Sequence, residues 1–205
     1  MSGLTIYGDV LSRTDRVLWL ANELGLEYEH RPVSLAQGGT RTPEMLALNP
    51  NGHIPVIVSD GQPLYESMAI NLFLARKHGG PLAPSGLSEE AQVLQWTFWV
   101  VTEVEPYVAR ALRNVGAMPG DPVNLELVAE QLARLKPPLT VLDDHLASRP
   151  YLLSDRFTVA DLNVAAVLSW TALVGFDMST HSRVAAWLTG CLSRPSVPRK
   201  SLPGA

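Results

Sequence analysis

Three short segments in the first seventy residues carry the side chains best suited to binding and activating a small polar molecule. Each lies where a loop meets the end of a helix or strand, a position that brings side chains and backbone donors together in α/β folds. The first segment, Leu11–Arg16, contains Ser12, whose hydroxyl can donate a hydrogen bond to a reacting group. The same hydroxyl could cap the helix that follows, with Asp15 completing a capping box, and the two roles can coexist.

The second segment, Asn49–Val56, places Pro55 at the start of a strand. Proline has no backbone N–H to donate, so this position indicates an edge strand or a strand start. Composition alone favours a trans bond between Ile54 and Pro55. A cis bond would turn the backbone N–H and C=O of Ile54 outward, where they could pair with a peptide-like ligand.

The third segment, Leu64–Ile70, places Glu66 and Ser67 at the start of a helix. The exposed N–H groups and the positive end of a helix favour an anion, such as a ligand carboxylate. Glu66 offers the opposite charge for an ammonium group. Ser67 could equally be an ordinary helix N-cap.

Other common reaction motifs are absent from the sequence. The five histidines show no HExxH spacing, and there is no GxGxxG after the first strand, no GxxxxGK[ST] and no GxSxG. We therefore expect no metal site, no dinucleotide or P-loop site, and no hydrolase serine elbow. The single cysteine, Cys191, excludes an internal disulfide or a CxxC pair, and we expect it to be a buried structural thiol.

Composition narrows the class of protein and its partners. The chain has 205 residues, is 46% hydrophobic and 18% charged, and carries a formal net charge of −4, so it can bury a large core and is unlike a nucleic-acid-binding protein. The apolar stretch Leu162–Phe176 is shorter than the roughly 20 residues of a membrane span, which predicts a buried helix and no membrane partner. The first residues lack the basic and apolar regions of a signal peptide, which predicts a cytoplasmic location.

The first eighty residues alternate between strand and helix patterns. Strands are predicted at 4–7, 28–33, 55–58 and 62–65, and helices at about 17–24, 44–48 and 67–77. The dipeptide Asp60-Gly61 separates the last two strands and predicts an antiparallel hairpin. The resulting order, β-α-β-α-β-β-α, matches a thioredoxin-like domain, which we place at residues 1–79.

The rest of the chain predicts an all-helical domain at residues 88–205, after a linker rich in glycine and proline at 80–87. One long helix is predicted over Glu89–Asn114. The fold class is therefore an α/β domain followed by an all-α domain.

The next predicted helix starts at Asp121 and carries one apolar seam from Leu125 to Leu146. The pair Pro137-Pro138 interrupts this seam and is expected to kink or restart the helix. Thr158 and Asp161 have the spacing of a capping box ahead of the buried helix.

Four stretches in register resemble the glutathione transferase family. They are SRTDRVLWLANELGLEYE, RTPEMLALNPNGHIPVIVSDG, LYESMAINLFLARK and YLLSDRFTVADL. The resemblance covers nearly the whole chain and implies a thioredoxin-like half, a linker and a helical half. It is strongest with the bacterial, theta- and phi-like branch, which uses a serine near the end of the first strand.

The resemblance implies that Ser12 activates the glutathione sulfur. Arg16 follows Ser12 by four residues, whereas phi-like members have a spacing of five. Alignment on the helix would shift the catalytic position, which leaves Thr14 and Arg13 as alternatives to Ser12.

The resemblance also implies which residues hold the rest of glutathione. Ile54 and Pro55 match the cis-proline pair whose backbone binds the cysteinyl unit, and Glu66-Ser67 match the pair that holds the γ-glutamyl group. His53 and Arg41 fall where family members carry polar or basic residues near the glycyl end.

The implied activity is attack of the glutathione thiol on hydrophobic electrophiles, with peroxidase, isomerase or dehalogenase variants. Glutathione is the cosubstrate, and no metal is required. Trp99, Glu103 and Tyr107, spaced by four on one predicted helical face, could line the electrophile pocket or a subunit interface, or pack in the core. The resemblance implies a homodimer. The same fold also serves as a noncatalytic adaptor, and the intact set of site residues favours the enzyme.

Overall fold

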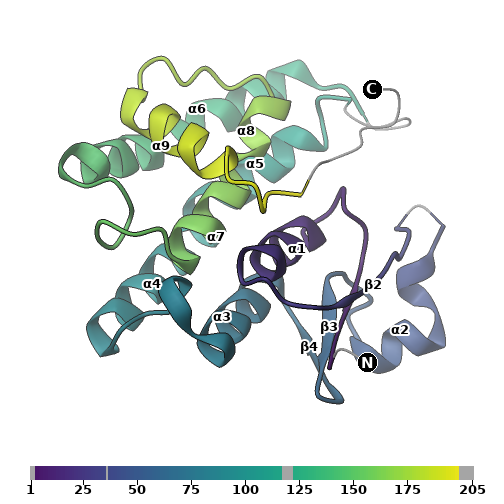
Figure 1. Cartoon of the computed structure of the whole chain (residues 1–205). Coiled ribbons are helices and arrows are strands. Elements are labelled where there is room, and N and C mark those ends of the chain that lie inside the picture. The colour runs from purple at the N-terminus through teal and green to yellow at the C-terminus, as the bar shows by residue number, and fades with distance from the viewer. Residues whose placement is uncertain (1–2, 36, 117–121, 199–205) are drawn as a thin grey trace. The chain divides into compact units, whose positions relative to one another are not determined.

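The computed structural model describes residues 3–35, 37–116 and 122–198 (Figure 1). The described residues fall into two compact units, one within Met1–Ala83 and Pro195–Ala205 and the other within Pro84–Arg194. The first unit contains a sheet with helices, and the second is helical. The predicted fold class, an α/β half followed by an all-helical half, is confirmed.

The first unit has its elements in the predicted order. They are β1 (Leu4–Tyr7), α1 (Thr14–Glu23), β2 (Glu29–Arg31), the short 3₁₀ helix η1 (Gly39–Arg41), α2 (Pro43–Leu48), β3 (Val56–Ser59), β4 (Gln62–Tyr65), α3 (Ser67–His78) and the 3₁₀ helix η2 (Gly80–Leu82). β2 is shorter than predicted, because only these three residues pair with β1.

The sheet has the strand order β2-β1-β3-β4. β1 runs parallel to β2, to which α1 connects it, and antiparallel to β3. β3 and β4 form the predicted antiparallel hairpin. Asp60 and Gly61 have φ values of 52° and 81°, as expected for the two central residues of a type I′ turn.

Helices cover both faces of the sheet. On one face, Ile6 and Ile57 are buried with side chains of α1 and α3, which pack against each other. On the other face, Met45 of α2 packs against Tyr7 and Val56. Side chains alternate between the two faces along each strand, so each strand supports both layers. Because both faces are packed, the position of each strand end within the sheet is fixed.

The second unit is built from helices. They are α4 (Leu87–Trp99), the π-helical turn η3 (Val100–Val104), α5 (Glu105–Leu112), α6 (Leu125–His145), the 3₁₀ helix η4 (Leu146–Ser148), α7 (Val159–Leu168), α8 (Trp170–Leu173) and α9 (Ser182–Leu192). Every residue of α7 is buried, so the predicted buried helix is confirmed from Leu162 to Leu168. The rest of the predicted stretch forms the separate short helix α8, in which Leu173 is 49% exposed.

The predicted long helix over Glu89–Asn114 is helical as far as Leu112, but a π turn divides it into two α-helices. α4 ends at Trp99, and a π turn connects it to α5. Pro106 cannot donate a backbone hydrogen bond, and the N–H of Glu105 reaches back five residues to the carbonyl oxygen of Val100. A proline at the start of α5 is therefore accommodated by one wider turn.

α6 runs unbroken through Pro137 and Pro138, so the helix does not restart there. The predicted start at Asp121 lies outside the described residues. The N-cap of α6 is Asn124, whose side-chain oxygen accepts a hydrogen bond from the N–H of Leu127 at 3.0 Å.

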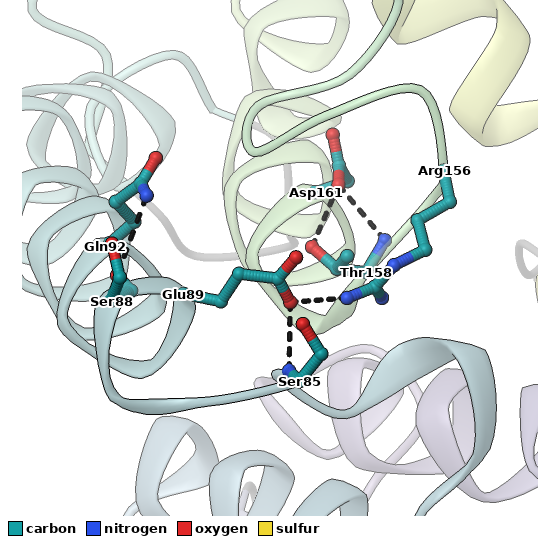
Figure 2. Close-up of polar contacts among 7 residues, drawn as sticks. All are labelled: Ser85, Ser88, Glu89, Gln92, Arg156, Thr158 and Asp161. Carbon is teal, nitrogen blue, oxygen red and sulfur yellow. Dashed lines mark hydrogen bonds and ion pairs between the residues drawn. The ribbon is translucent and has the colours of Figure 1, made fainter.

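Figure 2 shows polar contacts of the second unit around the start of α4 and the start of α7. The N–H and the hydroxyl of Thr158 both donate to one carboxylate oxygen of Asp161 at 2.9 Å, and the predicted capping box is confirmed. Glu89 accepts a hydrogen bond from the N–H of Ser85 at 2.8 Å and forms an ion pair with Arg156. The segment before α4 is thereby tied to the loop before α7.

Candidate functional site

Strand pairing brings the three predicted segments to one edge of the sheet. β1 ends at Tyr7, which pairs with Val56 at the start of β3. Val56 in turn pairs with Tyr65, the last residue of β4. The segments that follow β1, precede β3 and follow β4 therefore leave the sheet at the same edge, although they are far apart in the sequence.

Ser12 lies between β1 and α1, and its side chain is partly exposed. Its hydroxyl donates to the carbonyl oxygen of Asp9 at 2.6 Å and lies 2.9 Å from the hydroxyl of Thr14. The backbone N–H of Thr14 donates to the same serine oxygen at 3.1 Å. α1 begins at Thr14, with Arg13 at the N-cap position. The bond from the N–H of Thr14 to the Ser12 oxygen is nevertheless of the kind that a capping serine makes, so Ser12 keeps a capping role.

The two alternatives to Ser12 have very different exposure. Thr14 is 0% exposed, and Arg13 lies on the surface. A ligand can therefore reach the hydroxyl of Ser12 but not the hydroxyl of Thr14.

The Ile54–Pro55 peptide bond is cis, as the family resemblance implied. Ile54 is 8% exposed and belongs to an apolar cluster with Tyr7, Met45 and Val56. This packing holds the backbone of Ile54 at the same edge of the sheet as the end of β1.

Asn49 organises the loop that leads into β3, and sequence reasoning missed it. Its side chain is 1% exposed. The Asn49 amide donates to the carbonyl oxygen of His53 at 3.0 Å, and its oxygen accepts from the N–H and the side-chain amide of Asn51, each at 3.1 Å. Asparagine followed by proline and glycine is typical of such a self-bonded turn, and this composition was the available signal.

Arg41 is the last residue of η1, and His53 lies in the loop before β3. Both side chains are exposed. A Cβ added to Gly52, which has a φ of 63°, would come within 2.9 Å of the Arg41 guanidinium. The guanidinium therefore lies directly against the backbone of Gly52, the neighbour of His53, so the two exposed side chains come from adjoining segments and could both face an anionic group.

Glu66 and Ser67 connect β4 to α3. Glu66 is exposed and has a φ of 72°, which a residue other than glycine rarely adopts. Such backbone strain persists only where the surrounding structure fixes it, and it is concentrated at functional sites. Ser67 is the first residue of α3 and is 5% exposed. Glu66 is the N-cap residue, so the alternative in which Ser67 is the N-cap is wrong.

Trp99, Glu103 and Tyr107 lie in the second unit but not on one continuous α-helix. Trp99 ends α4, Glu103 lies in the π turn, and Tyr107 belongs to α5. Trp99 is partly buried and meets Trp96 edge to face, with ring centroids 5.0 Å apart. Glu103 is exposed, and Tyr107 is partly exposed with the guanidinium of Arg134 5.9 Å from its ring centroid.

The part of the chain that the structure describes offers neither a cluster of metal ligands nor a membrane span. No group of three or more histidine, cysteine, aspartate or glutamate side chains there could hold a metal ion. None of the helices described is long and apolar enough to cross a bilayer.

Comparison with known proteins identifies the family. The sequence profile described as "Glutathione S-transferase, N-terminal domain" matches residues 12–77, and the one described as "Glutathione S-transferase, C-terminal domain" matches residues 126–190. The chain is 35% identical over 212 residues to Glutathione S-transferase 3 of Zea mays, and the match covers 96% of this chain and 92% of that protein.

Solved structures agree with this assignment. A glutathione S-transferase from Pseudomonas fluorescens is 34% identical, with a TM-score of 0.85 and coverage of 97% of this chain and 98% of that one. The theta class glutathione S-transferase from Xanthomonas axonopodis pv. citri, with glutathione bound, is 27% identical, with a TM-score of 0.90 and coverage of 98% and 100%. A thioredoxin-like unit followed by a helical unit is thus shared with these enzymes. The chain belongs to the glutathione S-transferase family.

Proposed function

We propose that this chain is a glutathione transferase in which Ser12 activates the thiol of glutathione for attack on hydrophobic electrophiles. The observation that carries this proposal is the strand register, which gathers Ser12, Ile54 and the pair Glu66-Ser67 at one sheet edge. Bound glutathione supplies the nucleophile, a thiolate, and the residues of this chain supply the environment that keeps it ionised.

The residues at this edge fit a tripeptide that carries two carboxylates, one ammonium and one thiol. The first turn of α3 begins at Ser67 and offers unpaired N–H groups to a carboxylate. The Glu66 side chain is exposed beside it and can pair with an ammonium. Arg41, at the end of η1, and His53, in the loop before β3, are exposed and can face the second carboxylate.

Ser12 has to stabilise an anion at neutral pH. A free thiol has a pKa of about 8.5 and is only a few per cent ionised at pH 7. A hydrogen bond from the Ser12 hydroxyl to the sulfur, together with the nearby N-terminus of α1, favours the charged form. A decrease of about two pKa units, equivalent to about 2.7 kcal/mol, would make most of the bound thiol reactive at neutral pH.

The test is a glutathione titration followed by ultraviolet absorbance of the thiolate across neutral pH. We expect the wild-type protein to give a saturable thiolate signal with an apparent pKa well below that of free glutathione. We expect Ser12→Ala to bind glutathione but to move the apparent pKa back toward the free value. An unchanged pKa and unchanged conjugation rate in Ser12→Ala would exclude the role of Ser12 and turn attention to Arg13.

The same titration separates the enzyme from a noncatalytic adaptor. Saturable binding without ionisation of the thiol would support the adaptor. The partly exposed hydroxyl of Ser12 and the strained backbone of Glu66 favour the enzyme, because an adaptor needs neither feature.

We further propose that Trp99, Glu103 and Tyr107 contribute to binding the electrophile. The π turn that contains Glu103 supports this role, because such turns in helices are frequent at functional sites. Tyr107→Phe should change KM for the electrophile and leave KM for glutathione unaltered. Equal changes in both constants would contradict the assignment.

Homodimer formation and a cytoplasmic location are also part of the proposal. Leu87, Leu94 and Phe98 lie at spacings of seven and four on α4 and are exposed large apolar side chains, with Phe98 62% exposed. Such a row is expected at a subunit interface. Sedimentation equilibrium of the wild type and of Phe98→Asp would test the dimer, and cell fractionation would test the location.

A further inference from the structure

Among the residues that the structure describes, the Thr14 hydroxyl makes one hydrogen bond, with the hydroxyl of Ser12. Thr14 is 0% exposed, and its hydroxyl lies 2.9 Å from the hydroxyl of Ser12. A buried hydroxyl whose hydrogen finds no acceptor costs about 1–3 kcal/mol. The Ser12 oxygen is the acceptor that the structure places within reach, so Thr14 donates and Ser12 accepts.

The direction of this bond determines where the proton of Ser12 can go. A serine oxygen accepts through two lone pairs and donates through one hydrogen. The N–H of Thr14, at 3.1 Å, takes one lone pair, and the hydroxyl of Thr14 takes the other. With both lone pairs occupied, Ser12 can bond to a further group only by donating its hydrogen, which here goes to the carbonyl oxygen of Asp9 at 2.6 Å.

Gly8, the residue after β1, leaves space for the Thr14 hydroxyl because it has no side chain. Gly8 has a φ of 147°, and a Cβ placed there would lie 2.0 Å from the Thr14 hydroxyl oxygen. Glycine at position 8 and threonine at position 14 are therefore matched, since any side chain on Gly8 would displace the group that donates to Ser12.

We infer that Thr14 is a positioning residue for the thiol chemistry: its hydroxyl and its N–H saturate the acceptor capacity of Ser12, so that the one serine proton is delivered to the glutathione sulfur. This inference rests on the proposed function of Ser12. When sulfur binds, the Ser12 hydrogen leaves the carbonyl oxygen of Asp9 and bonds to the thiolate. Hydrogen bonds that feed into a donor strengthen the bond that it makes, so Thr14 also makes Ser12 a better donor.

The test compares Thr14→Val, which removes the hydroxyl, with Thr14→Ser, which keeps it. Loss of one neutral hydrogen bond is expected to raise the pKa of bound glutathione by about half to one unit in Thr14→Val. Below that pKa the thiolate fraction and the conjugation rate fall about three- to tenfold, and at high pH the rate recovers. KM for glutathione stays within about twofold, because Thr14 is buried away from the ligand. Thr14→Ser keeps the wild-type pH profile.

Two further variants keep the result decisive. Thr14→Ala removes the hydroxyl without adding an apolar group beside Gly8, and it replaces Thr14→Val if that variant fails to bind glutathione. In a Ser12→Ala background, Thr14→Val should cause no additional pKa shift, because its effect passes through Ser12.

The outcomes separate this inference from the proposed function. If Ser12→Ala shifts the pKa of bound glutathione and Thr14→Val does not, the positioning role of Thr14 is wrong and the role of Ser12 stands. If Thr14→Val shifts the pKa equally with and without Ser12, Thr14 acts by another route and the inference is overturned. If Ser12→Ala causes no shift at all, both proposals fail.

Discussion

Removal of the Asp161 carboxylate is expected to be the most damaging single change in the helical unit. Its side chain is 0% exposed, and its two oxygens accept four hydrogen bonds. One oxygen accepts from the N–H of Leu152 at 2.8 Å and from the indole of Trp187 at 3.2 Å. The other accepts from the N–H and the hydroxyl of Thr158, both at 2.9 Å. Burial raises the pKa of Asp161, and these four hydrogen bonds oppose that rise.

The magnitude follows from counting the donors that lose their acceptor. In Asp161→Ala all four donors are left buried, at about 1–3 kcal/mol each, so the loss is about 4 kcal/mol even at the lower value. Asp161→Asn keeps one acceptor oxygen but turns an amide toward the other two donors, and we expect a loss of about 2–4 kcal/mol. Thr158→Val removes one of the four bonds to the carboxylate and also the hydroxyl that accepts from the backbone N–H of Asp161 in the capping box, and it should cost about 1–2 kcal/mol. Natural domains are stable by only about 5–15 kcal/mol, so Asp161→Ala removes much of that margin.

The assay is urea unfolding followed by far-ultraviolet circular dichroism, with the midpoints of the series compared at a common slope. Asp155→Asn is the matched control, because Asp155 lies in the loop before α7 but is exposed. The expected order of stability is control, Thr158→Val, Asp161→Asn, Asp161→Ala. An Asp161→Asn variant within about 0.5 kcal/mol of the control would refute the reasoning, because it would show that the four bonds contribute little net free energy.

Three further predictions concern other parts of the chain. Gly8→Ala should lower the free energy of unfolding by about 2–4 kcal/mol and abolish the thiolate signal, because its Cβ would lie 2.0 Å from the Thr14 hydroxyl oxygen. The control is Gly25→Ala, which is also at positive φ but has no atom within 4 Å of the new Cβ; it should cost only about 1 kcal/mol in the same urea assay. The hydrogen bond from the N–H of Ser85 and the guanidinium of Arg156 lower the pKa of Glu89. The ionised Glu89 carboxylate should therefore stabilise the folded state fully above about pH 4.5, and this contribution should be lost as pH falls through the folded pKa. The difference in unfolding free energy between wild type and Glu89→Gln should shrink on acidification. Burial raises the pKa of the Cys191 thiol, so an aromatic disulfide reagent at neutral pH should modify Cys191 only after unfolding, and rapid reaction of the native protein would contradict its burial.

The order of elements in the first unit could be predicted because local signals there agree with the fold. The Asp60-Gly61 turn and the alternation in β3 and β4 both indicated a hairpin, and the structure has one. The break after Trp99 could not be predicted from apolar spacing, because that spacing continues through the π turn. Only the missing N–H of Pro106 hinted at it, and proline is common in the first turn of an ordinary helix.

The candidate site shows the same division between what sequence can and cannot provide. Residue types and turn signals identified Ser12, Ile54 and Glu66, but not that one register brings them together. That register is a long-range property: pairing of Val56 with both Tyr7 and Tyr65 places the three segments at one edge. A slip of one residue would turn the buried side chains of β3 to the opposite faces, so the core excludes it.

Burial decides between hydroxyls that the sequence presents as equals. Ser12 and Thr14 are two residues apart, and either could be a donor to a sulfur on residue type alone. Because Gly8 has no Cβ, the Thr14 hydroxyl can lie buried against the end of β1, whereas Ser12 is partly exposed. In the described part of the chain, the Thr14 hydroxyl donates to the Ser12 oxygen, and the Ser12 proton, now on the carbonyl oxygen of Asp9, can turn to a ligand. A pair that looks redundant in the sequence is thus divided by packing into one group that can contact a ligand and one that orients it.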